Sequence, residues 1–265
     1  MQTFKLNNGK DIPVVGLGTW QMVFHVHRTV LSGLQAGYRL IDTAKVYGNE
    51  PGIGQAVRES GIPRKEIFVT TKLWTNDLGY DSTLRAFDKS LERLGLEYID
   101  LYLIHWPGNE PARRRESWQA LEEVYKSGRV KAIGVSNYML GHLEELLGYA
   151  KITPAVNQIE FHPFVYDDQA PILEACHEQG IVVEAYSPLG HGRHMREPQV
   201  QKIAKAGGKT TAQIMLRWAI QHHAVPIPKT SHLERMRENL DIFDFELSAE
   251  DMDVLDALSR GDHIL

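Results

Sequence analysis

The chain has 265 residues, of which 43% are hydrophobic and 24% are charged, and it carries a formal net charge of -5. These proportions predict a globular protein with a large core and exclude a disordered or fibrous chain. The charges are spread without a basic stripe, so nucleic acids and anionic membrane surfaces are not expected partners. A single α/β barrel uses about 250 residues, and we therefore expect one domain spanning residues 1–265.

Neither a leader nor a membrane segment is expected from the sequence. Residues 1–6 lack the apolar run of a secretory signal peptide, and no stretch of about 18 apolar residues is present that could span a bilayer. The only cysteine, Cys176, cannot form an internal disulfide and is compatible with a reducing compartment. We therefore expect a cytoplasmic protein.

The first predicted element is a β-hairpin. Two short β-like runs, 4–6 and 11–14, flank the turn Asn7-Asn8-Gly9-Lys10. An Asn-Gly pair between such runs is a strong hairpin signal, because both residues tolerate the positive φ that a tight turn needs. The hairpin is expected to precede the main fold as a small lid.

Eight further β-like runs follow, separated by amphipathic segments. The runs cover residues 15–19, 39–42, 67–72, 99–104, 130–135, 155–159, 181–186 and 224–227. Between two of them, residues 82–94 place Leu84, Phe87 and Leu91 on one face at helical spacing. Strands that alternate with helices pair in parallel through right-handed crossovers, and eight of them predict a closed (β/α)8 TIM barrel. An open doubly wound sheet is the alternative architecture.

Signals at helix ends and glycines complete the predicted fold. Ser248 is a suitable N-cap for a last helix over 249–259, and Gly207-Gly208 marks the end of another helix. Gly16-Leu17-Gly18 is followed by Gln21, where the dinucleotide-binding pattern G-x-G-x-x-G needs a third glycine. We therefore assign these glycines to the first barrel strand and not to a Rossmann site.

Four polar residues lie where barrel strands are predicted to end, which is where α/β barrels carry their active sites. Asp42 ends the second strand, Tyr47 is in the loop that follows, Lys72 ends the third strand and His105 follows the fourth. If Lys72 pairs with Asp42 and approaches the hydroxyl of Tyr47, its charge lowers the pKa of Tyr47 and makes this residue a usable general acid. His105 could hydrogen-bond a carbonyl oxygen. Taken alone, each residue is explained equally well as a salt bridge, a surface tyrosine or a core histidine.

The segments around these residues form a series of motifs. In order they are GYRLIDTAKVYGNE (37–50), TKLW (71–74), LIHWP (103–107), GVSNY (134–138), VNQIEFHP (156–163), YSPLG (186–190) and IPKT (227–230). The series resembles the aldo-keto reductase superfamily over nearly the whole chain, in a pattern most like its microbial 2,5-diketo-D-gluconate and methylglyoxal reductases. Several motifs in matching order are far more specific than any single one, so the resemblance outweighs the separate structural explanations.

The resemblance implies a role for each residue of the site. The catalytic tetrad of the family corresponds to Asp42, Tyr47, Lys72 and His105. In the family, the tyrosine protonates the carbonyl oxygen while hydride arrives at the carbon. The nicotinamide end of the cofactor is implied to contact Ser136, Asn137, Gln158, Tyr186, Ser187 and Leu189. The first three would hold the carboxamide and the ring would stack on the tyrosine, whereas turn chemistry is the alternative explanation of the Ser-Asn pair.

A second set of residues is implied to grip the adenosine end of the cofactor. This set consists of Lys229, Thr230, Ser231, Arg235, Glu238 and Asn239. Lysine, hydroxyl and arginine groups that converge on a 2′-phosphate favour NADPH, because a dianion prefers paired cations. Arg235 could instead be a surface charge of a helix, which leaves NADH as a less favoured alternative.

The substrate pocket is predicted to have an apolar wall. Its residues are Trp20, Trp74 and Trp106, the last of which could equally pack in the core. Phe24 and its neighbour His25 are bulkier than the polar stretch expected in related sequences and are predicted to tune specificity. The sequence ends with residues 261–265, at a point where many relatives continue into a tail that covers the substrate. We therefore expect a more open pocket for small or polar aldehydes, α-dicarbonyls and keto sugars, and not for steroids.

Other functions fit parts of the sequence. The main alternative is a non-catalytic nucleotide-binding protein on the same scaffold, against which the complete tetrad argues. A barrel hydrolase or isomerase would need paired carboxylates, for which Asp42 and Glu160 are a weak candidate. The histidines of His191-Gly192-Arg193-His194 and His222-His223 lack the acidic or cysteine neighbours of a zinc site, so we expect solvated positions and no metal. The resemblance implies a monomer.

Overall fold

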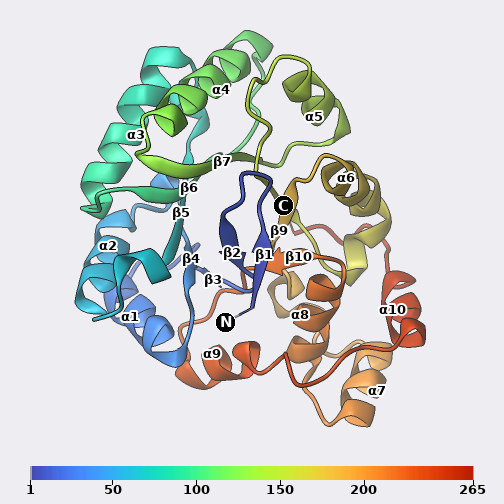
Figure 1. Ribbon diagram of the computed structural model, residues 1–265. Coiled ribbons are helices and arrows are strands. Elements are labelled where there is room, and N and C mark those ends of the chain that lie inside the picture. Colours follow the sequence, from blue (N-terminus) through green and yellow to red (C-terminus); the bar gives the residue numbers. More distant parts are fainter. Residues whose placement is uncertain (1, 265) are drawn as a thin grey trace.

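Eight parallel strands follow one another around the molecule in the order in which they occur in the chain (Figure 1). The structure is a computed structural model and describes residues 2–264. The strands are β3 (Leu17–Gly18), β4 (Leu40–Asp42), β5 (Phe68–Leu73), β6 (Ile99–Ile104), β7 (Val130–Ser136), β8 (Val156–Glu160), β9 (Val182–Tyr186) and β10 (Ala224–Pro226). Helices lie outside the strands, and the predicted (β/α)8 TIM barrel is confirmed.

Backbone hydrogen bonds close the sheet into a barrel. The amide of Gly16 donates to the carbonyl oxygen of Pro226 at 3.0 Å, and the amide of Gly18 donates to that of Pro228 at 3.1 Å. A side chain at position 18 would place its Cβ only 2.6 Å from the carbonyl oxygen of Ile227, so the close approach of the first strand to the last requires glycine. The two glycines belong to the barrel, as predicted, and the open doubly wound sheet is wrong.

Among residues 2–264, ten α-helices surround the barrel and five short 3-10 helices lie in the loops. The α-helices are α1 (Val26–Ala36), α2 (Glu50–Glu59), α3 (Tyr80–Leu94), α4 (Pro111–Lys126), α5 (Leu140–Leu147), α6 (Tyr166–Glu178), α7 (Pro198–Gly207), α8 (Thr211–Gln221), α9 (Leu233–Leu240) and α10 (Ala249–Asp256). The 3-10 helices are η1 (Lys45–Tyr47), η2 (Arg64–Glu66), η3 (Thr75–Asp77), η4 (Pro163–Val165) and η5 (Gly190–Gly192). No helix in this part of the chain is both long and apolar enough to cross a bilayer.

The predicted helix boundaries agree with the structure to within a few residues. The helix predicted over 82–94 lies within α3, which buries Phe87 against the barrel. Gly208 follows α7 with a φ of 64°, the left-handed cap that the glycine pair predicted. Ser248 caps α10 through reciprocal hydrogen bonds with Asp251. The last helix ends at Asp256, three residues earlier than predicted.

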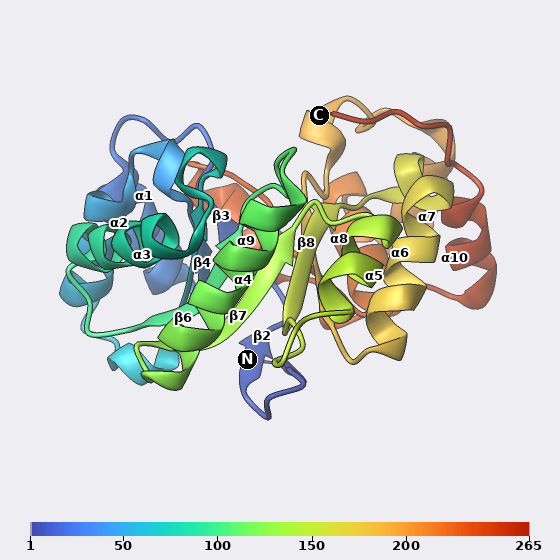
Figure 2. The same cartoon turned by 90° about the horizontal axis from the view of Figure 1, so that it is seen from above.

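The predicted hairpin closes one end of the barrel. Strands β1 (Thr3–Lys5) and β2 (Asp11–Pro13) pair in antiparallel fashion, and Ile12 packs inside the barrel with Leu40 and Leu101. A larger apolar layer lies between the strands and the helices. Figure 2 shows the hairpin at one end of the barrel and the end of the chain at the other. The polar residues at the strand ends therefore lie above an apolar plug, at the end opposite to the hairpin.

Candidate active site

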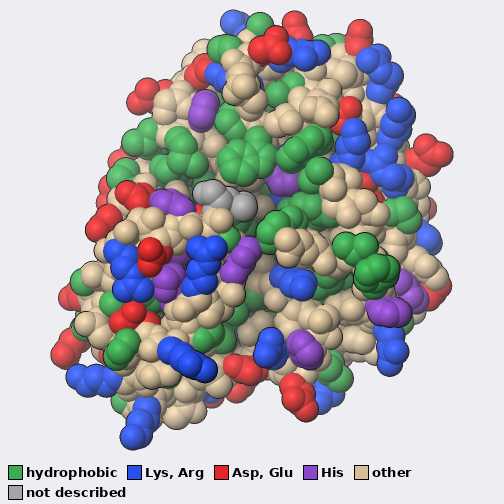
Figure 3. Space-filling model, turned by 180° about the vertical axis from the view of Figure 1, so that it is seen from behind, with side chains coloured by type: hydrophobic (Ala, Val, Ile, Leu, Met, Phe, Trp, Pro, Cys, Tyr) green, Lys and Arg blue, Asp and Glu red, His purple; other side chains and the backbone are tan. Residues whose placement is uncertain are grey.

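The face opposite the hairpin is hollowed by a cavity of about 1070 Å³, around which hydrophobic and histidine side chains gather (Figure 3). The cavity collects most of the residues predicted for the site. It is lined by Asp42, Tyr47, His105, Ser136, Asn137, Gln158, Tyr186, Ser187, Leu189, Lys229, Thr230, Arg235, Glu238 and Asn239, together with Trp20, Trp74 and Trp106. Lys72 lies behind the wall of the cavity, whereas Phe24 and Ser231 are not part of it.

A buried ion pair lies at the base of the cavity. Asp42 ends β4 and Lys72 lies near the end of β5, and both side chains are almost completely buried. The ammonium of Lys72 donates to both carboxylate oxygens of Asp42, at 2.7 and 2.6 Å, and to the carbonyl oxygen of Thr43 at 3.0 Å. Burial is the largest single influence on the pKa of Lys72 and would lower it, but the negative charge of Asp42, the hydrogen bonds to it and smaller contributions from neighbouring groups together raise this pKa. The lysine therefore stays charged in the interior.

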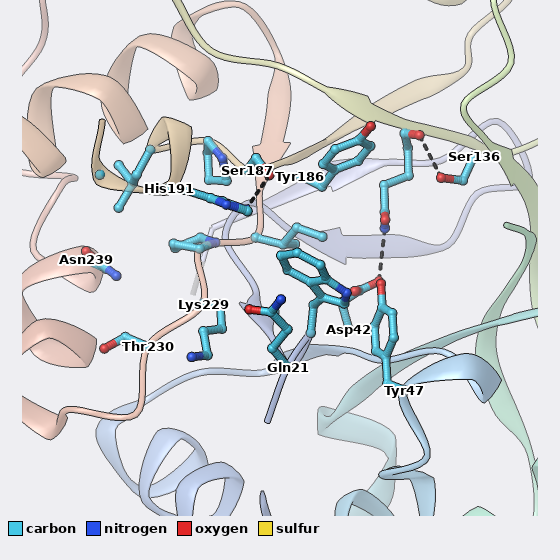
Figure 4. Close-up of a pocket in the computed structure, with 18 of the residues that line it drawn as sticks. Gln21, Asp42, Tyr47, Ser136, Tyr186, Ser187, His191, Lys229, Thr230 and Asn239 are labelled. Carbon is cyan, nitrogen blue, oxygen red and sulfur yellow. Dashed lines mark hydrogen bonds between the residues drawn. The ribbon is translucent and has the colours of Figure 1, made fainter. Parts of the chain in front are cut away.

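Tyr47 stands over this pair at the end of η1, and Figure 4 shows its ring pointing toward Asp42. The Nζ atom of Lys72 is 5.3 Å from the centre of the Tyr47 ring. Burial raises the pKa of Tyr47, and the positive charge of Lys72 opposes this rise only in part. The predicted lowering is thus wrong in its net direction, because desolvation of the phenolate outweighs the ammonium. Tyr47 remains protonated at neutral pH.

His105 packs between two aromatic rings of the cavity. Its ring meets that of Tyr47 edge-on at 5.7 Å and that of Trp74 edge-on at 5.2 Å. Burial, together with the charge of Lys72, lowers the pKa of His105 to about 2. The imidazole is therefore neutral over the working pH range and can offer a hydrogen bond without adding a charge.

A row of polar groups continues from the ion pair along the cavity. The Nε2 atom of Gln158 donates to Asp42 at 2.9 Å, a bond drawn as a dashed line in Figure 4. The hydroxyl of Ser136 donates to the backbone oxygen of Gln158, and the hydroxyl of Tyr186 donates to Oδ1 of Asn137. Asn137 has a φ of 61°. Such left-handed backbone in residues other than glycine is often found at functional sites.

The far end of the cavity carries two cations. Lys229 and Arg235 line it, are exposed, and make no ion pair with any other residue between 2 and 264. Beside them, Thr230 and Asn239 are buried, and Glu238 accepts a hydrogen bond from the hydroxyl of Thr210, the N-cap residue of α8. Ser231, predicted to join this group, is exposed and does not line the cavity.

The three tryptophans line the cavity, but Phe24 does not. Its side chain is 83% exposed. The loop that carries it lies between Gln21 and His25, which have φ values of 58° and 59°. These two residues have left-handed backbone conformations, and the loop between them exposes Phe24 to solvent. The pattern of hydrophobic residues in the sequence does not reveal such a turn. Phe24 is therefore not part of the cavity wall, and its contact with substrate stays a prediction.

The sequence did not predict the positions that His191, His194 and Glu184 take in or near the site. His191, expected in solvent, lines the cavity and stacks on Trp20 with ring centres 5.3 Å apart, so it joins the loops after β3 and β9. His194, also expected in solvent, is buried and stacks on Phe164. Glu184 of β9 is fully buried next to the ion pair. A charged residue inside the apolar run of β9 was the available signal for it.

Glu160 does not form a pair of catalytic carboxylates with Asp42. Its oxygens accept hydrogen bonds from the backbone of Ile264 at 2.7 Å, and they contact His162 at 3.2 Å and His263 at 3.3 Å. Burial would raise the pKa of Glu160, but these partners together lower it. A carboxylate held in this way does not line the cavity, and the hydrolase or isomerase alternative loses its proposed pair.

Known proteins share both the sequence and this architecture. The sequence profile of the Aldo/keto reductase family matches residues 14–260. The chain is 48% identical to a glyoxal reductase from Bacillus subtilis (strain 168), over 99% of this chain and 94% of that protein. The crystal structure of an aldo/keto reductase from Brucella melitensis superposes with a TM-score of 0.93 at 46% identity, covering 97% of this chain and 99% of that one. An aldo-keto reductase from Bombyx mori, solved in complex with NADP, gives a TM-score of 0.92 at 35% identity over 99% and 94%.

Proposed function

Because the chain belongs to the aldo/keto reductase family, we propose that it is an NADPH-dependent oxidoreductase that reduces the carbonyl group of small aldehydes, ketones and keto sugars to alcohols. The observation that carries the proposal is the buried pair of Asp42 and Lys72 beside Tyr47, in a cavity that also presents His105. All of these residues come from the same barrel, so one chain can form the whole site. This supports a single domain over residues 1–265 and a protein that works as a monomer.

In this proposal Tyr47 is the general acid. Burial keeps its hydroxyl protonated at neutral pH, so a proton is available for the carbonyl oxygen of the substrate. NADPH, when bound, supplies the hydride that the carbonyl carbon receives. As the proton leaves the hydroxyl of Tyr47, the ammonium of Lys72 stabilises the phenolate, while Asp42 holds that ammonium in place. The product is an alcohol, and Tyr47 regains its proton from solvent.

The remaining groups of this end of the cavity orient the substrate. His105 is neutral and would hydrogen-bond the same carbonyl oxygen, which fixes its position beside the phenol. Trp20, Trp74 and Trp106 surround this point with apolar surface. One relative is named a glyoxal reductase, which supports small aldehydes and α-dicarbonyls as the substrate class.

The two ends of the cavity fit the two ends of NADPH. At one end, the amides of Asn137 and Gln158 and the ring of Tyr186 offer hydrogen bonds and a stacking surface for a nicotinamide. At the other end, Lys229 and Arg235 lack protein counter-ions among the described residues, which suits the dianionic 2′-phosphate that distinguishes NADPH from NADH. A structural relative was solved in complex with NADP. These features support NADPH as the preferred cofactor.

Arg235→Ala is expected to weaken the binding of NADPH about 10- to 100-fold and to leave that of NADH nearly unchanged, because a charge-assisted hydrogen bond contributes about 1.5–3 kcal/mol. The dissociation constants of both nucleotides, measured by quenching of tryptophan fluorescence, check this prediction. Arg237→Ala is the matched control, since Arg237 lies exposed on the same helix but does not line the cavity. An equal loss for both nucleotides would remove the argument for a 2′-phosphate site.

The function itself is tested by the loss of nucleotide absorbance with methylglyoxal, glyoxal, a keto sugar and a steroid ketone, using NADPH and NADH in parallel. Turnover of the small carbonyls with NADPH supports the proposal. Tight nucleotide binding without turnover of any carbonyl would favour a non-catalytic nucleotide-binding protein. A protein that binds neither nucleotide would refute both functions.

A further inference from the structure

A buried carboxyl group lies beneath the nicotinamide end of the cavity. Glu184 is the third residue of β9, and its side chain is fully buried. Side chains alternate along a strand, so Glu184 points to the same side as Tyr186, which lines the cavity. In the register of the sheet, Glu184 lies beside Gln158 of β8. The catalytic steps described above leave Glu184 without a role.

The amide of Gln158 joins Glu184 to the ion pair. Its Nε2 atom donates to Oδ2 of Asp42 at 2.9 Å and to Oε2 of Glu184 at 2.8 Å. The amide nitrogen has two hydrogens, and the two carboxyl groups use both. Nε2 must be the atom that faces Asp42, because a carboxylate paired with Lys72 can only accept hydrogen bonds. The amide oxygen of Gln158 accepts no hydrogen bond from residues 2–264 and is left for a molecule in the cavity.

We propose that Glu184 is a positioning residue that, together with Asp42, turns the amide oxygen of Gln158 toward the cavity, where this oxygen accepts a hydrogen bond from the carboxamide of the nicotinamide. The inference rests on the proposed function, in which Gln158 contacts that carboxamide. A carboxamide has a donor side and an acceptor side, so a fixed acceptor at Gln158 distinguishes two orientations of the ring. Turning the ring over exchanges its faces, and Glu184 thereby contributes to the choice of the face that donates hydride.

Glu184 acts as a neutral acid in this arrangement. Burial, with a further contribution from the negative charge of Asp42, raises the pKa of Glu184 to about 8. Its Oε1 atom has no partner among the described residues, which costs less for a neutral acid than for a carboxylate. The charged groups that face it are Asp42 and Lys72, while its neighbour on β10, Val225, is apolar. The buried cluster is then electrically balanced.

The charge state of Glu184 predicts a pH dependence in the ligand-free protein. Its folded-state pKa of about 8 lies above the ordinary value of 4.5, so the unfolded chain loses this proton first and the wild type loses stability as the pH rises between these values. Glu184→Gln has no proton to lose. The melting temperature of Glu184→Gln relative to that of the wild type should therefore rise from about pH 5 to about pH 8, and the difference between the two should stay constant above this range. A difference that is the same at every pH would contradict the neutral acid.

The positioning role is tested by a double-mutant cycle on NADPH binding. Glu184→Leu removes the acceptor at similar volume, Gln158→Ala removes the amide, and a third variant carries both changes. We expect Glu184→Leu to weaken NADPH binding about 3- to 10-fold, the effect of one lost hydrogen bond. Glu184→Gln, whose side-chain oxygen can still accept, should restore most of this affinity. In the Gln158→Ala background, Glu184→Leu should have no further effect.

The hydride face provides a second readout. With the two epimers of NADPH that carry deuterium at C4 of the nicotinamide, the wild type should transfer label from one epimer, and Glu184→Leu should transfer a measurable fraction from both.

If Glu184→Leu does not fold, Glu184→Thr, whose side chain is too short to reach Gln158, replaces it in both experiments. A wild type without NADPH binding would overturn the proposed function and this inference together. Two other results would overturn the role of Glu184 alone, in a wild type that binds NADPH and reduces carbonyls. In the first, Glu184→Leu keeps the NADPH affinity and the face selectivity of the wild type. In the second, Glu184→Leu weakens NADPH binding by the same factor in the Gln158→Ala background as in the wild type.

Discussion

Tyr47→Phe is expected to lower kcat for carbonyl reduction by about 10²- to 10⁴-fold, the range that a general acid contributes, without a change in NADPH binding. The substitution removes one oxygen from a ring that keeps its packing against His105 and its place over Lys72. The lost interaction is made only while the proton moves, so kcat and kcat/KM should fall together. Turnover of methylglyoxal and the dissociation constant of NADPH, measured on the same preparation, check this expectation.

Tyr80→Phe is the matched control for this experiment. Tyr80 is an exposed tyrosine at the start of α3, and its hydroxyl has no place in the cavity, so its loss should leave kcat unchanged. If Tyr47→Phe kept a large share of the wild-type activity, the proton would have to come from another group. His105 is neutral and would be the next residue to replace.

The fold could be predicted from the sequence because its signals are local. Each strand is a short apolar run, each helix has an amphipathic face, and their alternation leaves few architectures. These local signals do not determine whether the sheet closes into a barrel, since an open sheet uses the same strands and helices. The contacts that decide it are those of Gly16 and Gly18 with residues more than 200 positions away, and such pairings between distant segments are not encoded in any one stretch of sequence.

The residues that form the site could be predicted from the sequence, but the burial and the pKa shifts of their side chains could not. Strand-end positions and ordered motifs brought Asp42, Tyr47 and Lys72 together correctly in space. The direction of the shift in the pKa of Tyr47 was wrong, because burial depends on every surrounding side chain and not on the nearest charge. The exposed position of Phe24 and the stacking of His191 on Trp20 are likewise set by loop backbone, for which a single sequence carries little information.

Lys72→Met is expected to lower the free energy of unfolding by about 3–5 kcal/mol, the cost of leaving one member of a buried ion pair without its partner. Lys72 is fully buried and donates to both carboxylate oxygens of Asp42 and to the backbone of Thr43. Methionine keeps much of the volume of the side chain, so the change removes mainly the charge and its hydrogen bonds. Chemical denaturation of the ligand-free protein measures the effect.

The matched comparison is the surface pair of Lys5 and Asp11. Their ion pair, at 2.8 Å, joins the same two residue types, but the side chains are 71% and 48% exposed. Lys5→Met should hardly move the denaturation midpoint, because water and salt screen an exposed pair. Adding Asp42→Asn to Lys72→Met removes the uncompensated charge and should recover part of the lost stability. If Lys72→Met cost no more than Lys5→Met, the buried pair would provide no fixed cation, and the phenolate of Tyr47 would have to be stabilised by some other group during reduction.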